Sequence, residues 1–357
     1  MREGWEYKKL NEVCDKGSSN IVINKLIDNN GDYPLYGASG LIKDIDFYHQ
    51  DKRYIGIVKD GAGVGRVNIY PAFSSLVGTM QYIFPKEGYS LDFIKYFLIK
   101  LDLSHCVSGA TIPHIYFKDY GKELIPTPSL DAQLEIVSEL DKINELIRLK
   151  KEQLKDFDNL AQSIFYEMFG EGKCLRKKLK DIVKIQSGQV SPLEEPYSEM
   201  IHIGPANIES NTGRLLNLKT AKEENLISGK YLFDSSMVLY SKIRPNLNKV
   251  TIPSFEGICS ADMYPIIPLE SIDKNFLLFL LKQKEFLTYA ISNSGRANIP
   301  KINREALLNY EAILPPLPLQ HLFAHRIEQT EHQKSEVQKA ITDLETLLAS
   351  RMQYWFE

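Results

Sequence analysis

The stretch Ile125-Pro126-Thr127-Pro128-Ser129 stands directly before a long helical pattern, and Leu314-Pro315-Pro316-Leu317-Pro318 precedes a second one. Proline is excluded from helix interiors but suits the entry to a helix, and Ser129 is a suitable N-cap residue. These stretches therefore predict that each of two globular units is followed by a long helix. In order along the chain, unit, helix, unit and helix are expected over residues 1–128, 129–172, 173–316 and 317–357.

Apolar residues recur in steps of four and three along both predicted helices, which is the spacing of a coiled-coil seam. In the first helix the seam positions are Ile136, Leu140, Ile143, Ile147, Lys150, Leu154 and Phe157. In the second helix they are Phe323, Ile327, Lys334, Val337, Ile341, Leu344 and Leu348. We expect the two helices to pack on each other, although two independent helices that each cap one unit are the alternative. Lys150 and Lys334 would cost stability inside this seam and could fix its register.

The two halves of the chain repeat each other in the same order. Ser108-Gly109 corresponds to Ser294-Gly295, and Ile112-Pro113 corresponds to Ile299-Pro300. The offset between matching positions drifts along the chain, as insertions in surface loops would cause. The sequence therefore predicts a tandem repeat of two mixed α+β units that are rich in strands in their middles.

Composition excludes several classes of protein. The chain has 357 residues, 43% of them apolar and 25% charged, which is typical of a globular protein with two domains. No apolar run is long enough to span a bilayer, and the first residues do not form a secretory signal. The four cysteines are scattered, which is typical of reduced thiols in a cytoplasmic protein. The net charge of −3 conceals acidic helices and mildly basic globular units.

Common catalytic and metal-binding motifs are missing from the sequence. The glycine-rich loop between Lys59 and Arg66 has the spacing of neither a dinucleotide fingerprint nor a P-loop, and a turn between two strands is the better interpretation. Histidine and cysteine spacings indicate no metal site. We therefore expect a binding protein and no enzyme, with a cryptic active site as one alternative.

Two pairs of loops carry side chains that are suited to DNA. Lysine neutralises phosphates, whereas arginine and asparagine can read guanine and adenine edges. In the first unit the candidates are Lys59, Arg66, Thr111 and His114. In the second unit they are Lys242, Arg244, Asn246, Arg296 and Asn298. A coiled-coil scaffold that binds protein partners without reading DNA remains the alternative.

The chain resembles the specificity subunit of type I restriction–modification systems. The resemblance rests on Trp5 with Lys9-Leu10-x-Glu12-Val13, on Ile125-Pro126-x-Pro128-x-Leu130-x-x-Gln133, and on the matching second-half segments Lys178-Leu179-x-Asp181-Ile182, Ser294-Gly295 and Leu314-Pro315-Pro316-Leu317-Pro318-Leu319-Gln320. It covers nearly the whole chain and is specific as an architecture, although no single motif is specific. The usual acidic neighbour of the glutamine is missing at Gln320.

The resemblance implies that each unit is a target recognition domain for one half of a bipartite DNA site. It implies that the helices form an antiparallel coiled coil, which sets the spacing between the half-sites. Two adenine methyltransferase subunits would dock on this chain and bind S-adenosylmethionine, and ATP-driven restriction subunits could join them. No cofactor or metal is expected on the chain itself, which would be non-catalytic, cytoplasmic and without membrane contact.

Overall fold

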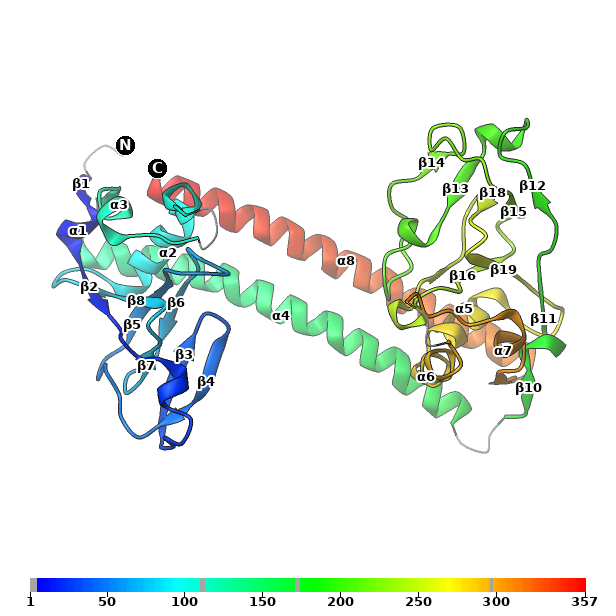
Figure 1. Ribbon diagram of the computed structural model, residues 1–357, viewed down its shortest axis with the longest axis horizontal. Coiled ribbons are helices and arrows are strands. Elements are labelled where there is room, and N and C mark those ends of the chain that lie inside the picture. The colour runs from blue at the N-terminus through cyan, green and yellow to red at the C-terminus, as the bar shows by residue number, and fades with distance from the viewer. Residues whose placement is uncertain (1–4, 110–112, 171–173, 296–297) are drawn as a thin grey trace. The chain divides into compact units, whose positions relative to one another are not determined.

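The computed structural model describes residues 5–109, 113–170, 174–295 and 298–357. The chain forms two compact units. Unit 1 contains Met1–Leu154 and Val337–Glu357, and unit 2 contains Lys155–Glu336. Both units are mixed α+β, and both contain parts of two long helices (Figure 1).

Unit 1 is built on two sheets. The strands of its four-stranded antiparallel sheet are, in spatial order, β2 (Cys14–Ser18), β8 (Met80–Pro85), β5 (Tyr54–Val58) and β6 (Val67–Tyr70). A three-stranded sheet has the order β4 (Gly40–Ile45), β3 (Tyr33–Gly37) and β7 (Ser75–Leu76). The short helical segments are α1 (Leu10–Val13), α3 (Phe117–Tyr120), Ile23–Lys25 and Leu103–Cys106. All five residues of β5 are buried, which explains the strongly apolar sequence of this strand.

Unit 2 contains a four-stranded sheet with the same antiparallel order. Its strands are β11 (Val183–Ile185), β19 (Met263–Pro268), β16 (Val238–Ser241) and β17 (Val250–Thr251). A five-stranded sheet has the order β12 (Gln189–Val190), β15 (Lys230–Phe233), β18 (Gly257–Cys259), β13 (Ile201–Ile203) and β14 (Lys219–Thr220). The two four-stranded sheets therefore repeat each other, whereas the second sheets of the units differ.

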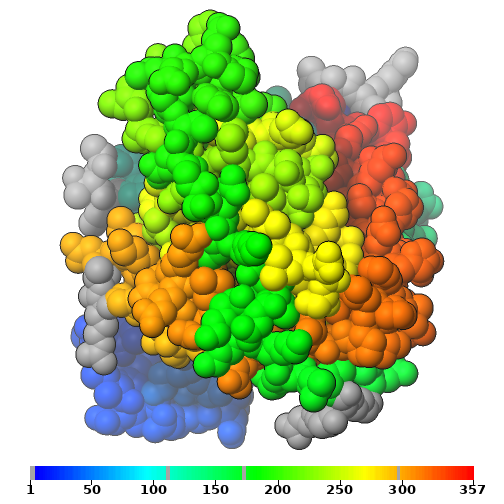
Figure 2. Space-filling view, turned by 90° about the vertical axis from the view of Figure 1, so that its right-hand side faces the viewer, coloured from blue at the N-terminus to red at the C-terminus, as the bar shows by residue number. Residues whose placement is uncertain are grey.

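Helices and short ladders complete each unit. In unit 1 these are α2 (Leu91–Leu101) and the pair β1 (Glu6–Lys9) with β9 (Leu124–Thr127). In unit 2 they are α5 (Lys274–Lys282), α6 (Lys284–Ser292), α7 (Arg304–Leu308) and the pair β10 (Arg176–Lys178) with β20 (Glu311–Ile313). Four 3₁₀ turns lie at Leu179–Asp181, Tyr197–Glu199, Pro205–Asn207 and Pro245–Leu247. Figure 2 looks onto the face of unit 2 where the orange segment of α6 and α7 lies beside the green segment of β10.

The two long helices are α4 (Leu130–Phe169) and α8 (Leu317–Phe356), each of 40 residues and therefore about 60 Å long. In unit 1, Glu139 contacts Arg351, and Lys151 forms an ion pair with Glu345 at 2.7 Å. Later residues of α4 thus contact earlier residues of α8. The predicted antiparallel pairing of the two helices is confirmed.

Unit 2 has the same pairing direction. The Asp158 carboxylate of α4 accepts a hydrogen bond of 2.8 Å from Lys334 of α8, and the Phe165 ring lies 5.8 Å from the Phe323 ring. Since Lys334 follows Phe323 whereas Asp158 precedes Phe165, the helices again run in opposite directions.

Burial follows the heptad positions along both helices. The buried seam residues are Ile136, Leu140, Ile143, Ile147, Phe323, Val337 and Ile341. The half-buried ones are Lys150, Leu154, Phe157, Ile327, Lys334, Leu344 and Leu348. The Lys150 ammonium donates to Gln153 at 3.1 Å, and that of Lys334 also donates to Glu331 at 3.1 Å. Both seam lysines therefore keep polar partners at the edge of the interface, which reduces the cost of their charge.

Candidate nucleic-acid interface

In unit 1 the two loops that sequence analysis selected lie against each other. The first loop follows β5 and begins at Lys59, and the second precedes α3. The Gly61 amide donates to the Pro113 carbonyl at 2.9 Å, and the Ile115 amide donates to the Lys59 carbonyl at 2.9 Å. Backbone hydrogen bonds therefore fix one loop on the other, so that their side chains form one surface.

Unit 2 repeats this arrangement bond for bond. The Arg244 amide donates to the Pro300 carbonyl at 2.7 Å, and the Ile302 amide donates to the Lys242 carbonyl at 3.0 Å. The structure thus brings together residues 59–66 with 113–115, and residues 242–246 with 298–302. We name these surfaces loop pair 1 and loop pair 2.

Loop pair 1 carries an exposed arginine on a glycine-rich turn. Arg66 is exposed and its guanidinium donates to the Ala38 carbonyl at 3.0 Å. Gly63 has a φ of +86°, and a Cβ there would collide with the Arg66 side chain. Lys59 is half-buried, with its ammonium 3.7 Å from the Asp60 carboxylate. The turn therefore directs Arg66 toward the loop tip of the β3–β4 hairpin.

The second loop of pair 1 contributes an aromatic and basic group. The His114 ring lies 5.0 Å from the Tyr116 ring, and the Lys118 ammonium lies 5.1 Å from the centre of the same ring. The two rings meet edge to face. Aromatic rings, on which bases can stack, and cations are both suited to nucleic acid. Thr111, the remaining candidate of this unit, lies outside the described residues.

Loop pair 2 places two of its candidates in solvent. Arg244 and Asn246 are exposed on either side of Pro245, where a 3₁₀ turn begins, and Arg244 adopts a left-handed φ of +47°. No hydrogen bond or ion pair joins the Arg244 guanidinium to any residue that the structure describes. Asn298 is also exposed, whereas Arg296 lies outside the described ranges. Arg244 and Asn246 are thus free to meet a ligand.

Lys242 is engaged inside its own unit. Its ammonium donates to the Ala261 carbonyl and lies 3.6 Å from the Asp262 carboxylate. It also lies 5.8 Å from the centre of the Tyr264 ring. Because these contacts hold the Lys242 ammonium within unit 2, Lys242 is less available to a ligand than Arg244.

Two exposed lysines at the loop pairs were not among the candidates from the sequence. Lys118 contacts Tyr116 directly after loop pair 1, and Lys301 pairs with Ile243 through an isolated β-bridge in loop pair 2. Lys301 directly follows the repeated Ile299-Pro300, so its place in the repeat was the available signal. Lys118 lies on α3, for which the sequence repeat offered no comparable marker.

Within the described ranges, no group of three or more histidine, cysteine, aspartate or glutamate side chains is suited to a metal ion. Among the same residues, no helix combines the length and the apolar character needed to cross a bilayer.

Comparisons with known proteins identify the family of the chain. The model of the type I restriction modification DNA specificity domain matches residues 2–156 and again residues 175–346. The type I restriction enzyme EcoDI specificity subunit of Escherichia coli is 26% identical over 386 residues, which cover 95% of this chain and 84% of that protein. The MjaVIII specificity subunit of Methanocaldococcus jannaschii is 25% identical, over 81% of this chain and 76% of its own.

Solved structures share the fold. The S subunit of a type I restriction–modification system from M. genitalium matches with a TM-score of 0.62 and 15% identity, over 100% of this chain and 98% of its own. A chain from a structural study of complex assembly and conformational transition in the type I R-M system matches with a TM-score of 0.61 and 16% identity, over the same shares of both chains.

The two family matches coincide with the two halves of the internal repeat and together cover most of the chain. The chain therefore belongs to the type I restriction modification DNA specificity domain family, carries that domain twice in tandem, and is a non-catalytic specificity subunit.

Proposed function

We propose that each unit reads one half of a bipartite DNA site through its loop pair. The observation that carries this proposal is the repetition of the same two backbone hydrogen bonds in both units, at Gly61 and Ile115 and at Arg244 and Ile302. Each loop pair presents an exposed arginine, Arg66 or Arg244, and arginine can pair with guanine in a bidentate manner. Thr111, His114, Asn246, Arg296 and Asn298 are the further contacts that we propose.

The antiparallel helices would set the distance between the two half-sites. In a direct repeat whose trailing helices pair antiparallel, a local twofold between the two halves would suit the local twofold of duplex DNA. A continuous helix of about 60 Å is long enough to separate two readers by one DNA turn of about 34–36 Å. Coiled-coil length would thereby fix half-site spacing, while the loop pairs fix the bases.

The outer faces of the long helices suit protein partners. Leucines outside the seam are 41–51% exposed, namely Leu134, Leu146, Leu149, Leu160, Leu319, Leu322 and Leu347. Leu134, Val137 and Leu146 line one groove on α4. Exposed apolar side chains on a helix are typical of surfaces that dock against a protein partner. We propose that two adenine methyltransferase subunits dock here.

S-adenosylmethionine would then bind to the methyltransferase subunits, and ATP to restriction subunits where these join. This chain would itself hold no cofactor. We expect the assembly to act in the cytoplasm, where such a DNA target would lie.

Methylome sequencing tests the proposal directly. A host without its own adenine methylation would express this chain together with its methyltransferase subunit. We expect one methylated bipartite motif with a fixed spacer. Methylation without a motif, or a complex that assembles but binds all DNA equally, would support the scaffold alternative instead.

A further inference from the structure

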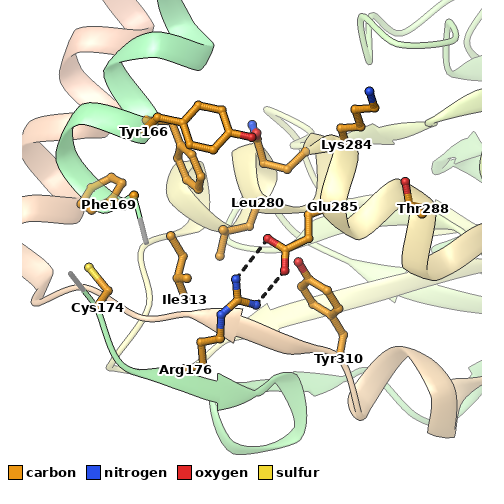
Figure 3. A pocket seen from close by; sticks show the side chains of 13 residues that line it. Tyr166, Phe169, Cys174, Arg176, Leu280, Lys284, Glu285, Thr288, Tyr310 and Ile313 are labelled. Carbon is orange, nitrogen blue, oxygen red and sulfur yellow. Dashed lines mark hydrogen bonds and ion pairs between the residues drawn. The ribbon is translucent and has the colours of Figure 1, made fainter. Parts of the chain in front are cut away.

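Unit 2 contains a cavity of about 550 Å³ between the C-terminal end of α4, strand β10 and helix α6 (Figure 3). Its lining includes Tyr166, Phe169, Cys174, Arg176, Gln283 and Glu285. The volume lies in the range of cavities that bind small ligands. None of the loop-pair residues takes part in it.

The register of two short ladders identifies the corresponding residues of unit 1. Tyr7 of β1 pairs with Pro126 of β9, and Arg176 of β10 pairs with Ile313 of β20. These pairs occupy the same place in the repeat. Tyr7 thus corresponds to Arg176, and Trp5, two residues earlier, corresponds to Cys174.

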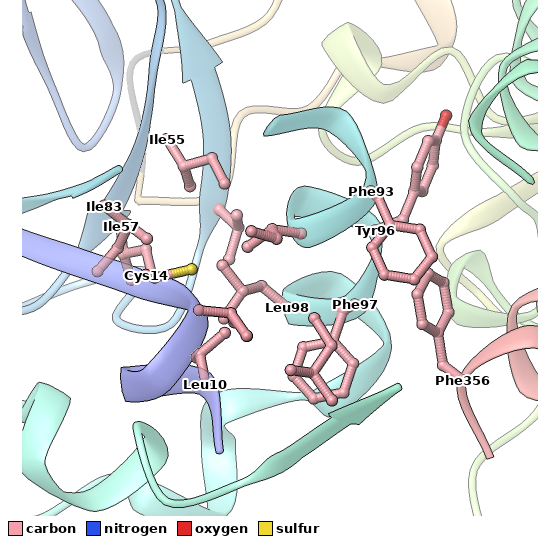
Figure 4. Packing of buried hydrophobic residues seen from close by; sticks show 14 of the residues in the cluster. Leu10, Cys14, Ile55, Ile57, Ile83, Phe93, Tyr96, Phe97, Leu98 and Phe356 are labelled. Carbon is pink, nitrogen blue, oxygen red and sulfur yellow. The ribbon is translucent and has the colours of Figure 1, made fainter. Parts of the chain in front are cut away.

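The ends of the long helices correspond in the same way. In unit 1 the Phe356 ring lies 5.1 Å from the Phe93 ring of α2 (Figure 4), and in unit 2 the Phe169 ring lies 5.4 Å from the Phe276 ring of α5. Glu357 follows Phe356 and Gly170 follows Phe169, so Glu357 corresponds to Gly170. Lys100 lies seven residues after Phe93 and Gln283 seven residues after Phe276, so Lys100 corresponds to Gln283.

In unit 1 these positions are filled by large side chains. The Trp5 ring stacks on the Trp355 ring at 6.1 Å, with their planes 8° apart, and both rings pack on the hydrophobic core. The Lys100 ammonium forms an ion pair of 2.6 Å with the Glu357 carboxylate. In unit 2 the corresponding residues are cysteine, glutamine and glycine. The lining of the cavity therefore includes Cys174, Gln283 and Gly170, the residues that correspond to Trp5, Lys100 and Glu357 of unit 1.

The inner wall of the cavity is aromatic. Phe165 and Phe169 are buried in its inner wall, and the Tyr166 ring is 60% exposed beside it. Water would find few hydrogen-bond partners on these rings. The aromatic faces can stack with a planar ligand.

An ion pair that lines the cavity also favours an aromatic ligand. The Arg176 guanidinium forms a two-pronged ion pair with the Glu285 carboxylate, at 2.7 and 3.2 Å (Figure 3). This pairing uses the edge of the guanidinium and leaves its flat faces available to stack on an aromatic ring. The N–H of a bound indole ring could at the same time donate to the Glu285 carboxylate.

We propose that this cavity binds an indole-sized aromatic group, supplied by a tryptophan side chain of a protein partner or by a free aromatic molecule. In unit 1 the chain supplies the ring itself through Trp5. The two ends of this duplicated protein would thus differ, with one closed and the other open to a ligand. The proposal goes beyond DNA reading and does not depend on it.

Indole is the probe for the first test, with the full chain and ligand-observed NMR. Wild type is expected to bind indole, whereas Cys174→Trp, which restores the ring of unit 1, should lower the affinity at least tenfold. Thr288→Trp blocks the cavity from an exposed position of α6 and should do the same without risk to the core. Leu175→Trp is the matched control, because Leu175 is 78% exposed and does not line the cavity.

The affinity of each variant for the methyltransferase subunit shows where the ring comes from. If a partner side chain supplies it, Thr288→Trp weakens assembly at least tenfold, whereas Leu175→Trp does not. If a free molecule supplies it, all variants assemble alike and only the cavity variants lose indole binding. Absence of indole binding to wild type, or equal binding to Thr288→Trp and wild type, would overturn the proposal. DNA recognition measured on the same proteins reports separately on the loop pairs.

Discussion

Gln133 and Gln320 make the same set of hydrogen bonds at the same place in the two units. The Gln133 side-chain oxygen accepts from the Ser90 amide at 2.9 Å, and that of Gln320 accepts from the Asp273 amide at 2.8 Å. Each side-chain nitrogen donates to a proline carbonyl, that of Pro128 at 2.9 Å or that of Pro315 at 2.7 Å. Each glutamine therefore ties the start of a long helix to the N-cap of the helix that packs beside it.

Replacement of either glutamine by leucine should destabilise its unit by roughly 2–3 kcal/mol. Both side chains are almost completely buried, and their loss leaves a buried amide and two carbonyls without partners. Urea unfolding would measure this, and Gln133→Leu should shift the transition of unit 1 while Gln320→Leu shifts that of unit 2. Gln338→Leu, at an exposed position of α8, should change stability by no more than about 0.5 kcal/mol.

The sequence alone predicted the features that rest on local patterns. Proline before a helix and apolar steps of four and three depend on neighbours in the chain, so the helices and their seam could be predicted from residues such as Ile136 and Val337. The repeat likewise marked loops that later proved to be joined by hydrogen bonds. Gln133 and Gln320 were part of the matching segments, but their hydrogen bonds were not predicted.

The remaining features depend on residues far apart in the chain. Gln133 bonds to Ser90, which is 43 positions away, so no local pattern indicates the role of this glutamine. Lys242 donates to the Ala261 carbonyl, 19 positions away, and the prediction of Lys242 as a DNA contact could not anticipate this bond. The cavity at Cys174 becomes visible only when the register of two ladders is compared. Packing, and not composition, decides such features.

Arg244→Ala should weaken binding to one half-site roughly tenfold or more, which corresponds to the loss of one bidentate base contact. Because the guanidinium has no partner within the described part of unit 2, folding should not change. Fluorescence anisotropy with the cognate duplex, and with duplexes changed in either half-site, would measure the effect.

The matched control is Arg326→Ala, which removes an exposed arginine from α8, outside the loop pairs. It should leave discrimination of both half-sites intact. Wild-type affinity and specificity in Arg244→Ala would contradict the assignment of this residue.

His202 should make unit 2 less stable in mild acid. The ring is buried on β13, its Nδ1 lies 2.7 Å from the Glu224 carboxylate, and its Nε2 has no hydrogen-bond partner among the described residues. Burial lowers the pKa of His202 below its ordinary value of about 6.5, although the bond to Glu224 opposes this shift. The unfolded chain therefore takes up the proton more readily, and stability present above about pH 6.5 is lost as the pH falls through the lower, folded-state pKa.

Urea unfolding between pH 7.5 and pH 5 would check this dependence. His202→Gln should lose less stability over that window than wild type, whereas His332→Gln, at an exposed position of α8, should follow wild type. Parallel curves for His202→Gln and wild type would exclude His202 as the source.

Removal of one heptad from both long helices should shorten the spacer of the recognised DNA site by about 3 base pairs. Deletion of residues 149–155 and 337–343 keeps the heptad phase and removes segments that lie between the paired residues Glu139 with Arg351 and Asp158 with Lys334. Seven residues correspond to about 10 Å of helix, and one base-pair step to about 3.4 Å. Methylome sequencing should find both half-site sequences unchanged, because the loop pairs are untouched. Deletion of residues 149–155 alone leaves α8 one heptad longer than its partner, so that variant should lose seam packing and methylation together. An unchanged spacer in the double deletion would show that the coiled coil does not measure the distance.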